Sequence, residues 1–245
     1  MADFTLDGYR ALLEAFMQRG YVAGRFSEDG PLDRHLFLRH DLDMSIQAAV
    51  AVAKIEREAG LMTTYFVMVR TEMYNPFSKR GLADIIQLAD LGHELGLHFD
   101  GSLYGEDLEA LDEAAERECA ALEVLTNLPV TVISLHRPAP VLQGLDRRIA
   151  GRLHTYSPRF FQDMGYCSDS RGDWHHGHPL DHPAVAAGRG FQLLTHPIWW
   201  QAAPNEAVRE KLDRFALKRF DLLRAELARN CEAYPQEYQT DYIEG

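Results

Sequence analysis

The hydrophobic positions along this chain follow two alternating periods, which predict helices and strands in turn. Apolar residues at helical spacing predict helices over 9–17, 46–55, 82–89, 108–125 and 205–230. Runs rich in β-branched and aromatic residues predict strands over 21–26, 35–39, 62–69, 94–98, 130–135, 166–168 and 191–195. This alternation is typical of a mainly parallel sheet with helices outside it. We therefore expect an α/β fold in a single domain over residues 1–245.

Composition fits this picture and excludes several kinds of partner. The 245 residues are 46 % hydrophobic, which suits one α/β barrel with a large core. The formal net charge of −12 argues against a nucleic-acid partner, because phosphate binding needs clustered Lys and Arg. Cys119, Cys167 and Cys231 form neither a metal-binding pattern nor a disulfide framework. The first residues lack a signal peptide and no apolar stretch approaches the roughly 20 residues of a membrane span, so we expect a cytoplasmic protein.

Polar residues follow the strand over 35–39 directly, in the sequence His40-Asp41-Leu42-Asp43. Asp41 and Asp43 are two residues apart, so on a continuing strand both side chains face the same way. Two carboxylates so close together are costly without a cation or a shared proton to offset their charges. A metal site beside a base is one interpretation of this segment. The other is a helix start, with Asp43 or Ser45 capping the helix from residue 46.

Four of the predicted strands end in histidine, at His40, His98, His136 and His196. In a barrel of parallel strands the carboxyl ends meet at one face, where active sites are built. Imidazole nitrogens and a carboxylate oxygen suit a divalent cation, and Zn²⁺ fits this set best. A metal ion beside a base makes a nucleophile from water near neutral pH. The strand ends therefore predict a hydrolytic metal site.

Five segments resemble, in the correct order, the motifs of the polysaccharide deacetylase family of carbohydrate esterases. They are residues 39–43, 92–98, 137–138, 168–174 and 193–196. Within the family the chain is most similar to a divergent group associated with surface-polysaccharide biosynthesis. The resemblance implies a distorted, incomplete (β/α) TIM-like barrel. It also implies metal-dependent removal of an acetyl group from an N-acetylated sugar.

The resemblance assigns catalytic roles to residues in these motifs. Asp41 would be the general base that takes a proton from water, and His196 would protonate the departing amine. Arg137 would hold Asp41 ionised and oriented. Asp169 or Asp173 would hold an acid or base side chain in place.

The resemblance also makes Asp43 and His98 metal ligands, but the chain departs from the family at the next ligand. The family usually has a second ligating histidine four residues after the first, and this chain has Ser102 there. His136, at a neighbouring strand end, is our candidate for the third ligand. The alternatives are Asp100 and His40. Without a substitute, the site would be metal-free or inactive.

Aromatic and amide side chains near the motifs are candidates for substrate contacts. Tyr74 and Asn75 suit stacking and hydrogen bonding to a sugar, although turn formation at Asn75-Pro76 explains Asn75 equally well. Trp174 is the third candidate for a substrate contact. The histidine-rich segment 174–182 fits no common zinc pattern, and a loop at the mouth of the site is the favoured interpretation.

Three functions remain open at this stage. The leading hypothesis is an N-deacetylase that acts on a sugar or sugar conjugate with a divalent metal. The second is a hydrolase of a non-sugar linear or cyclic amide, which the missing histidine at position 102 would allow to work without metal. The third is a non-catalytic sugar-binding protein. The presence of both Asp41 and His196 speaks against this third hypothesis, because such a protein has no chemical need for the pair.

Overall fold

The structure is a computed structural model that describes residues 4–26, 33–138, 140–175, 177–203 and 205–239. The chain divides into two compact units, Met1–Gln201 and Ala202–Gly245. In the described part of the chain, the first unit contains all the strands, and the second contains helix α7 (Val208–Asn230). That residues 1–245 form a single domain stays a prediction. No helix within the described ranges is long and apolar enough to cross a membrane.

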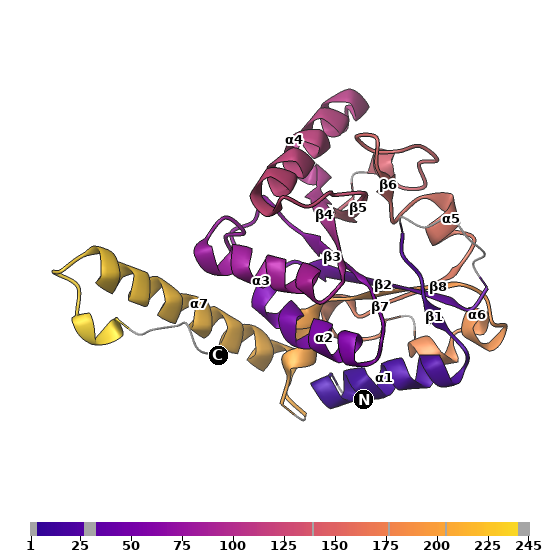
Figure 1. Cartoon of the computed structure of the whole chain (residues 1–245), viewed down its shortest axis with the longest axis horizontal. Coiled ribbons are helices and arrows are strands. Elements are labelled where there is room, and N and C mark those ends of the chain that lie inside the picture. The colour runs from indigo at the N-terminus through magenta and orange to yellow at the C-terminus, as the bar shows by residue number, and fades with distance from the viewer. Residues whose placement is uncertain (1–3, 27–32, 139, 176, 204, 240–245) are drawn as a thin grey trace. The chain divides into compact units, whose positions relative to one another are not determined.

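All the strands of the sheet pair in parallel, in the order β6-β5-β4-β3-β2-β8-β7, and β1 pairs with the start of β2 (Figure 1). Their bounds are β1 Val22–Ala23, β2 His35–Leu42, β3 Thr64–Val67, β4 Glu94–Asp100, β5 Val132–His136, β6 Leu153–His154, β7 Gly165–Ser168 and β8 Phe191–Thr195. Within the described ranges β6 and β7 are the two ends of this order, so the barrel does not close. The predicted α/β fold, a distorted and incomplete (β/α) TIM-like barrel, is confirmed.

The predicted strand over 35–39 extends to Leu42, so Asp41 lies on the strand and not in the loop after it. In the described part of the irregular region between residues 137 and 190, one strand and two α-helices are not predicted by the sequence. They are β6, α5 (Pro158–Phe161) and α6 (Pro183–Ala186). A strand of two residues and helices of four residues are too short to show a hydrophobic period.

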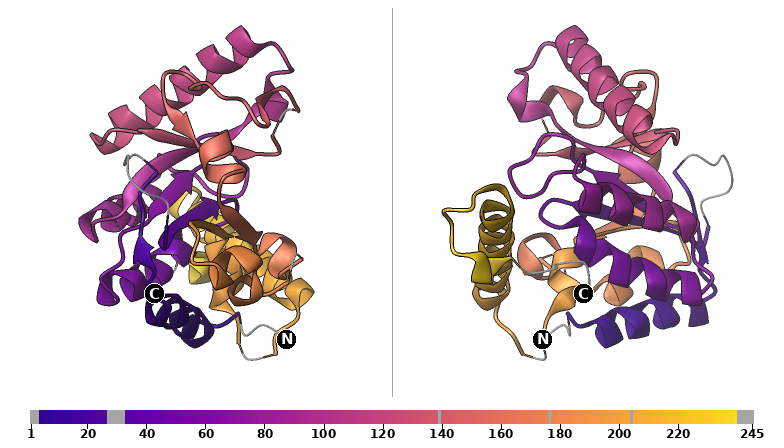
Figure 2. Two further views of the ribbon diagram at one scale, coloured as in Figure 1. Left: turned by 90° about the vertical axis from the view of Figure 1, so that its right-hand side faces the viewer. Right: turned by 60° about the vertical axis from the view of Figure 1, so that its left-hand side comes forward.

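Four helices lie side by side along the outer face of the sheet (Figure 2). They are α1 (Leu6–Gln18), α2 (Ile46–Glu58), α3 (Lys79–Asp90) and α4 (Leu108–Thr126). The hydroxyl oxygen of Ser45 caps α2 by accepting a hydrogen bond from the backbone N–H of Ala48 at 3.1 Å. Of the two candidate caps, the structure thus uses Ser45. This leaves the carboxylate of Asp43 available to the strand ends.

The inner face of the sheet changes character along the strands. Phe37, Arg39 and Asp41 alternate with outward-facing residues on β2, as the period of two requires. At the amino end, Phe37 and Phe66 belong to a buried apolar cluster. Gly96 on β4 makes room for this cluster, because a Cβ atom there would lie 2.5 Å from the Phe66 ring. The polar side chains therefore lie near the carboxyl ends of the strands, next to this buried apolar cluster.

Candidate active site and metal centre

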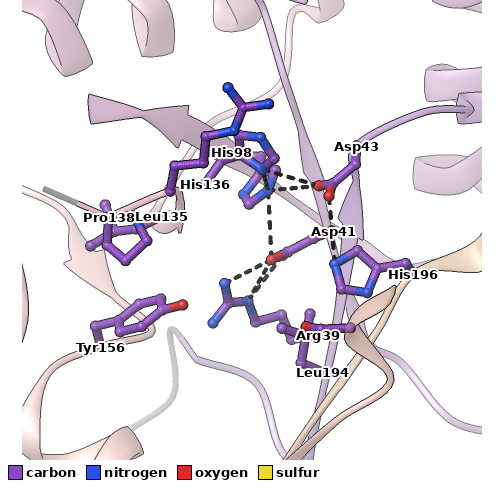
Figure 3. A pocket seen from close by; sticks show the side chains of 12 residues that line it. Arg39, Asp41, Asp43, His98, Leu135, His136, Pro138, Tyr156, Leu194 and His196 are labelled. Atoms are coloured by element: carbon purple, nitrogen blue, oxygen red, sulfur yellow. Dashed lines mark hydrogen bonds and ion pairs between the residues drawn. The ribbon is translucent and has the colours of Figure 1, made fainter. Parts of the chain in front are cut away.

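The carboxyl ends of the central strands border a cavity of about 160 Å³ (Figure 3). Predicted site residues from four strand ends line this cavity: Asp41, Asp43, His98, His136 and His196. Parallel pairing of β2 with both β3 and β8, and of β4 with β5, brings these distant segments to one edge. The cavity is therefore the candidate active site.

Asp43, His98 and His136 form a group that could hold a metal ion. Each offers one ligand atom, and these atoms all lie within 4.8 Å of one another. The Nε2 atom of His98 is 2.9 Å from Oδ1 of Asp43 and 3.1 Å from Nδ1 of His136. Burial by itself raises the pKa of Asp43, but hydrogen bonds from His136 and His98 hold it well below its usual value. One carboxylate and two imidazoles suit a small divalent cation such as Zn²⁺.

A hydrogen-bonded chain sets the tautomer of His98. The hydroxyl of Ser134 donates to Oδ1 of Asp41 at 2.8 Å, because an ionised carboxylate only accepts. The Ser134 oxygen must then accept the 2.7 Å hydrogen bond from Nδ1 of His98. Nδ1 is therefore a protonated nitrogen, and Nε2, beside Asp43 and His136, is the nitrogen that would ligate a metal ion. This tautomer is the one that metal ligation through Nε2 needs.

Arg39 binds the carboxylate of Asp41 in a buried, two-pronged ion pair. Its Nε and Nη2 atoms lie 2.9 Å and 2.7 Å from Oδ1 and Oδ2, and the two side chains are 0 % and 3 % exposed. Burial alone raises the pKa of Asp41, but the charge of Arg39 lowers it below its usual value. This corrects our prediction for Arg137, which follows β5 with a left-handed backbone (φ 45°) and is exposed. Arg39 takes its place because residues two apart on a strand share a face.

Asp169 holds His196 from behind. Both carboxylate oxygens accept the backbone N–H of His196, at 3.0 and 3.1 Å, and Oδ1 lies 2.7 Å from Nδ1 of the ring. Nδ1 must carry a proton toward this carboxylate, so Nε2 is the atom that faces the cavity, 3.7 Å from Asp43 Oδ2. Burial lowers the pKa of His196, but the hydrogen bond and charge of Asp169, then the charges of Asp43 and Asp41, raise it to about 9. A pKa of about 9 favours the protonated ring at neutral pH.

The two alternative third ligands have other partners. His40 lies on the opposite face of β2 from Asp41, with Nδ1 2.7 Å from the Thr195 hydroxyl and Nε2 2.7 Å from Glu56. Asp100 accepts hydrogen bonds from the backbone N–H and the hydroxyl of Ser102. Neither residue belongs to the metal-binding group within the described ranges. Of our three candidates, His136 is the one beside Asp43 and His98.

The predicted substrate contacts do not line the cavity. Tyr74 is buried in the main core, where its hydroxyl accepts the backbone N–H of Met68 at 2.8 Å. Asn75 is exposed, and its side-chain oxygen accepts the backbone N–H of Phe77, as the turn interpretation requires. Trp174 is buried in an aromatic cluster with Phe4 and with Trp200, whose indole N–H binds Asp169. Aromatic packing and turn geometry thus account for these side chains.

The histidine-rich segment 174–182 forms a capped loop, with residue 176 outside the described ranges. Nδ1 of His178 accepts the backbone N–H of Leu180, and Nδ1 of His182 accepts that of Ala184. These hydrogen bonds use the ring nitrogens to cap short helical turns. The two rings are therefore structural side chains.

Sequence reasoning did not single out Arg39 and Tyr156, which line the cavity, or Ser134, which bonds to Asp41 and His98. Arg39 and Ser134 each precede a predicted site residue by two positions on its strand, so the period of two places them on the same face. That signal was present in the sequence. Tyr156 lines the cavity and follows β6. It gives no comparable signal, because β6 has only two residues.

No protein-family model matches the chain, and no curated protein matches it. Solved structures similar to it include a variant of BA3943 from Bacillus anthracis, described as a CE4 family pseudoenzyme, at 15 % identity and a TM-score of 0.42. The alignment covers 77 % of this chain and 63 % of that one. They also include the Streptococcus pyogenes deacetylase PplD, at 13 % identity and a TM-score of 0.44, with 85 % of both chains covered. A third is a family 4 carbohydrate esterase from Bacillus anthracis, at 15 % identity and a TM-score of 0.43, with 84 % and 85 % covered.

Proposed function

We propose that this protein is a metal-dependent hydrolase that removes an acetyl group from an N-acetylated sugar or sugar conjugate. One observation carries the proposal: a metal-binding group, a carboxylate held by Arg39 and an imidazole held by Asp169 all line one cavity. Amide hydrolysis needs a Lewis acid, a base and an acid within reach of one bond. The cavity offers a candidate for each of these roles.

The protein's own residues supply the proton transfers. Asp41, ionised and oriented by Arg39, accepts a proton from the attacking water. His196 donates a proton from Nε2 to the departing amine, which leaves poorly as an anion, while Asp169 stabilises the cationic ring. Asp43, His98 and His136 would hold the divalent cation, with Zn²⁺ as our first choice. When bound, such a cation polarises the carbonyl and lowers the pKa of a coordinated water.

Metal content tests the metal centre directly. We expect the purified protein to bind about one divalent ion per chain, since three protein ligands with an open position are typical of catalytic zinc. His98→Ala and His136→Ala should each weaken this binding by about 100-fold or more, because each removes one of three ligands. Elemental analysis after dialysis against limiting Zn²⁺ measures the loss. His175→Ala is the matched control, because His175 is an exposed residue outside the metal-binding group.

Three results would each contradict one part of this proposal. Full metal content in His136→Ala would remove His136 as a ligand. Wild-type protein that hydrolyses an N-acetyl sugar after complete metal removal would favour the metal-independent amide hydrolase. Metal binding without hydrolysis of any N-acyl compound would favour a binding protein.

The pair of His196 and Asp169 predicts the alkaline side of the pH profile. His196 must be protonated to act as the acid, so kcat/KM should fall as pH rises through a pKa of about 9. Asp169→Asn removes the main group that raises this pKa, so the alkaline limb should move toward the ordinary value of 6.5. Activity at neutral pH should also fall, by about 100-fold.

Asp173→Asn is the matched control for this experiment, because Asp173 is the other candidate holder and is exposed. Its side chain accepts only the neighbouring backbone N–H of Trp174 at 2.8 Å among the contacts of the described residues. The alkaline limb of the kcat/KM profile of Asp173→Asn should match that of the wild type. A shift in Asp173→Asn without one in Asp169→Asn would reverse the assignment.

A further inference from the structure

We propose that Arg39 also determines substrate specificity, by binding a carboxylate of the substrate through its Nη1 atom. The N-acyl compound that enters the cavity would then carry a carboxylate close to its scissile amide. This inference rests on the proposed hydrolase and names its class of substrate. The role is separate from the hold that Arg39 has on Asp41.

The evidence begins with an unused donor. Arg39 is 0 % exposed and lines the cavity. Its Nε and Nη2 atoms bind Asp41, but Nη1 is buried and has no hydrogen-bond partner among the described residues. A buried charged donor without an acceptor is costly, and buried polar groups in native proteins are nearly always paired. An oxygen of a molecule in the cavity would complete this guanidinium.

The guanidinium is held in place before any ligand arrives. Its Cζ atom lies 5.0 Å from the centre of the Tyr156 ring and 5.9 Å from that of Phe66. With Asp41 fixing the other two nitrogens, the side chain has little freedom left to lose on binding. Figure 3 shows the hydroxyl of Tyr156 turned toward Arg39. Nη1 and this hydroxyl together form a preorganised site for an oxygen acceptor.

Charge decides which acceptor fits best. The two carboxylates of the lining are already engaged, Asp41 by Arg39 and Asp43 by His98 and His136. Among the lining side chains in the described part of the chain, Arg39 has the buried donor that lacks an acceptor, its Nη1 atom. This donor belongs to a guanidinium, and hydrogen bonds from a guanidinium are strongest to an anion. A carboxylate matches the planar guanidinium and adds a single negative charge beside Asp41.

The net charge of −12 means that attraction of an anionic substrate has to be local to the cavity. A protein of this charge repels anions at long range, so no general attraction explains an anionic substrate. Recognition must come from short hydrogen bonds inside the cavity. Binding of a carboxylate there should therefore persist in salt, which screens the repulsion between exposed charges.

Two sources of the carboxylate are compatible with the site, and three substrates separate them. N-Succinylglucosamine carries the carboxylate on the acyl group, and N-acetylglucosaminuronic acid carries it on the sugar. N-Acetylglucosamine is the neutral reference. We expect the wild-type holoenzyme to prefer one of the acids over the neutral sugar by about 10- to 100-fold in kcat/KM, as for one charged hydrogen bond.

Arg39→Lys tests the residue, because lysine keeps a cation for Asp41 but lacks the guanidinium fork. Activity should fall on all three substrates, since Asp41 is held less well. The readout is the ratio of kcat/KM for the acidic substrate to kcat/KM for the neutral one. In Arg39→Lys this ratio should fall toward one, mainly because KM for the acid rises. In Arg137→Met, the matched arginine of the cavity mouth, the preference should stay within about threefold of the wild type.

A binding measurement without catalysis completes the test. Calorimetric titration of metal-free protein with succinate should give binding that acetate and phosphate do not match. Tyr156→Phe keeps the ion pair of Arg39 and Asp41, so it should fold even if Arg39→Lys does not. It should weaken succinate binding several-fold.

Each outcome decides a different point. Equal turnover of acidic and neutral substrates, or an unchanged preference in Arg39→Lys, would overturn the role of Arg39 and leave the hydrolase intact. Absence of hydrolysis and of metal would overturn the proposed function. In that case, succinate binding that Tyr156→Phe weakens would still support the carboxylate site. Wild-type protein that does not bind succinate would exclude the site on the acyl side, and one that also shows no preference for the uronic acid would exclude it altogether.

Discussion

Asp41→Asn is expected to lower kcat/KM by about 10⁴-fold, the upper end for loss of a general base. It should also destabilise the fold by about 3–5 kcal/mol, because one partner of a buried ion pair is removed. Arg39 is 0 % exposed, so its charge would remain in the protein interior without a counter-ion. The loss of activity and the loss of stability thus arise from one substitution, and a second variant is needed to separate them.

The double variant Arg39→Met/Asp41→Asn removes the buried charge as well as the base. Replacement of a whole buried ion pair by groups of similar volume is often nearly neutral, so its stability should return to within about 2 kcal/mol of the wild type. Its activity should stay as low as that of the single variant. Denaturant unfolding and steady-state kinetics on the three proteins measure the two effects.

Asp112→Asn is a suitable control for this series. It breaks the ion pair of Asp112 with Arg147, whose side chains are 30 % and 40 % exposed. Exposed pairs contribute less than about 1 kcal/mol, so both stability and kcat/KM should change little. If Asp41→Asn keeps more than a tenth of the activity while folded, the base is another group. If the double variant is less stable than the single one, the ion pair stabilises the fold outright.

Local patterns were sufficient to predict which strand ends meet at the cavity. Asp41, Asp43, His98 and His136 all follow apolar runs, and the parallel barrel brings such ends to one edge. The same pattern contained Arg39, because a period of two puts it on the face of Asp41. The Arg137 assignment came from the family resemblance, whereas in the structure the nearer arginine, Arg39, forms the ion pair with Asp41.

Other features depend on register and packing, which the sequence does not reveal. His40 and His136 both lie near strand ends. They differ in the face of the sheet to which each side chain points, and the sequence does not reveal this. Tyr74 is a residue type expected at a sugar contact, but its hydroxyl accepts a hydrogen bond from the backbone N–H of Met68. Glu56 lies among the apolar residues of α2. A charged residue is expected to be exposed, but Glu56 is 0 % exposed.

Glu56→Gln is expected to destabilise the protein by about 3–5 kcal/mol at neutral pH, the cost of breaking a buried charged network. Oε1 of Glu56 accepts the hydroxyl of Tyr9 at 2.5 Å and lies 2.7 Å from Nε2 of His40. Oε2 accepts the hydroxyls of Tyr65 at 2.5 Å and Thr63 at 2.9 Å. A glutamine offers one oxygen in place of two and turns an NH₂ group toward these donors.

The pKa of Glu56 predicts how this stability depends on pH. Burial raises the pKa, but the charge and hydrogen bond of His40, then the charge of His93 and the hydrogen bond of Tyr65, lower it from 4.5 to about 2. A carboxyl whose pKa is lower in the folded state stabilises it above the unfolded pKa. This contribution is lost as pH falls through the folded value. The shift corresponds to about 3 kcal/mol at neutral pH.

Glu58→Gln is the matched control, since it makes the same substitution on the same helix. Glu58 pairs with Arg10 at the surface, where the side chains are 61 % and 43 % exposed, so less than about 1 kcal/mol should be lost. Denaturant unfolding at neutral pH and near pH 3 should show the gap between wild type and Glu56→Gln narrowing by about 2 kcal/mol in acid. A gap that does not change with pH would mean that the carboxylate charge is not what stabilises this network. Because His40 stands between Arg39 and Asp41 and bonds to Thr195, beside His196, the network fixes β2 and β8 directly behind the candidate active site.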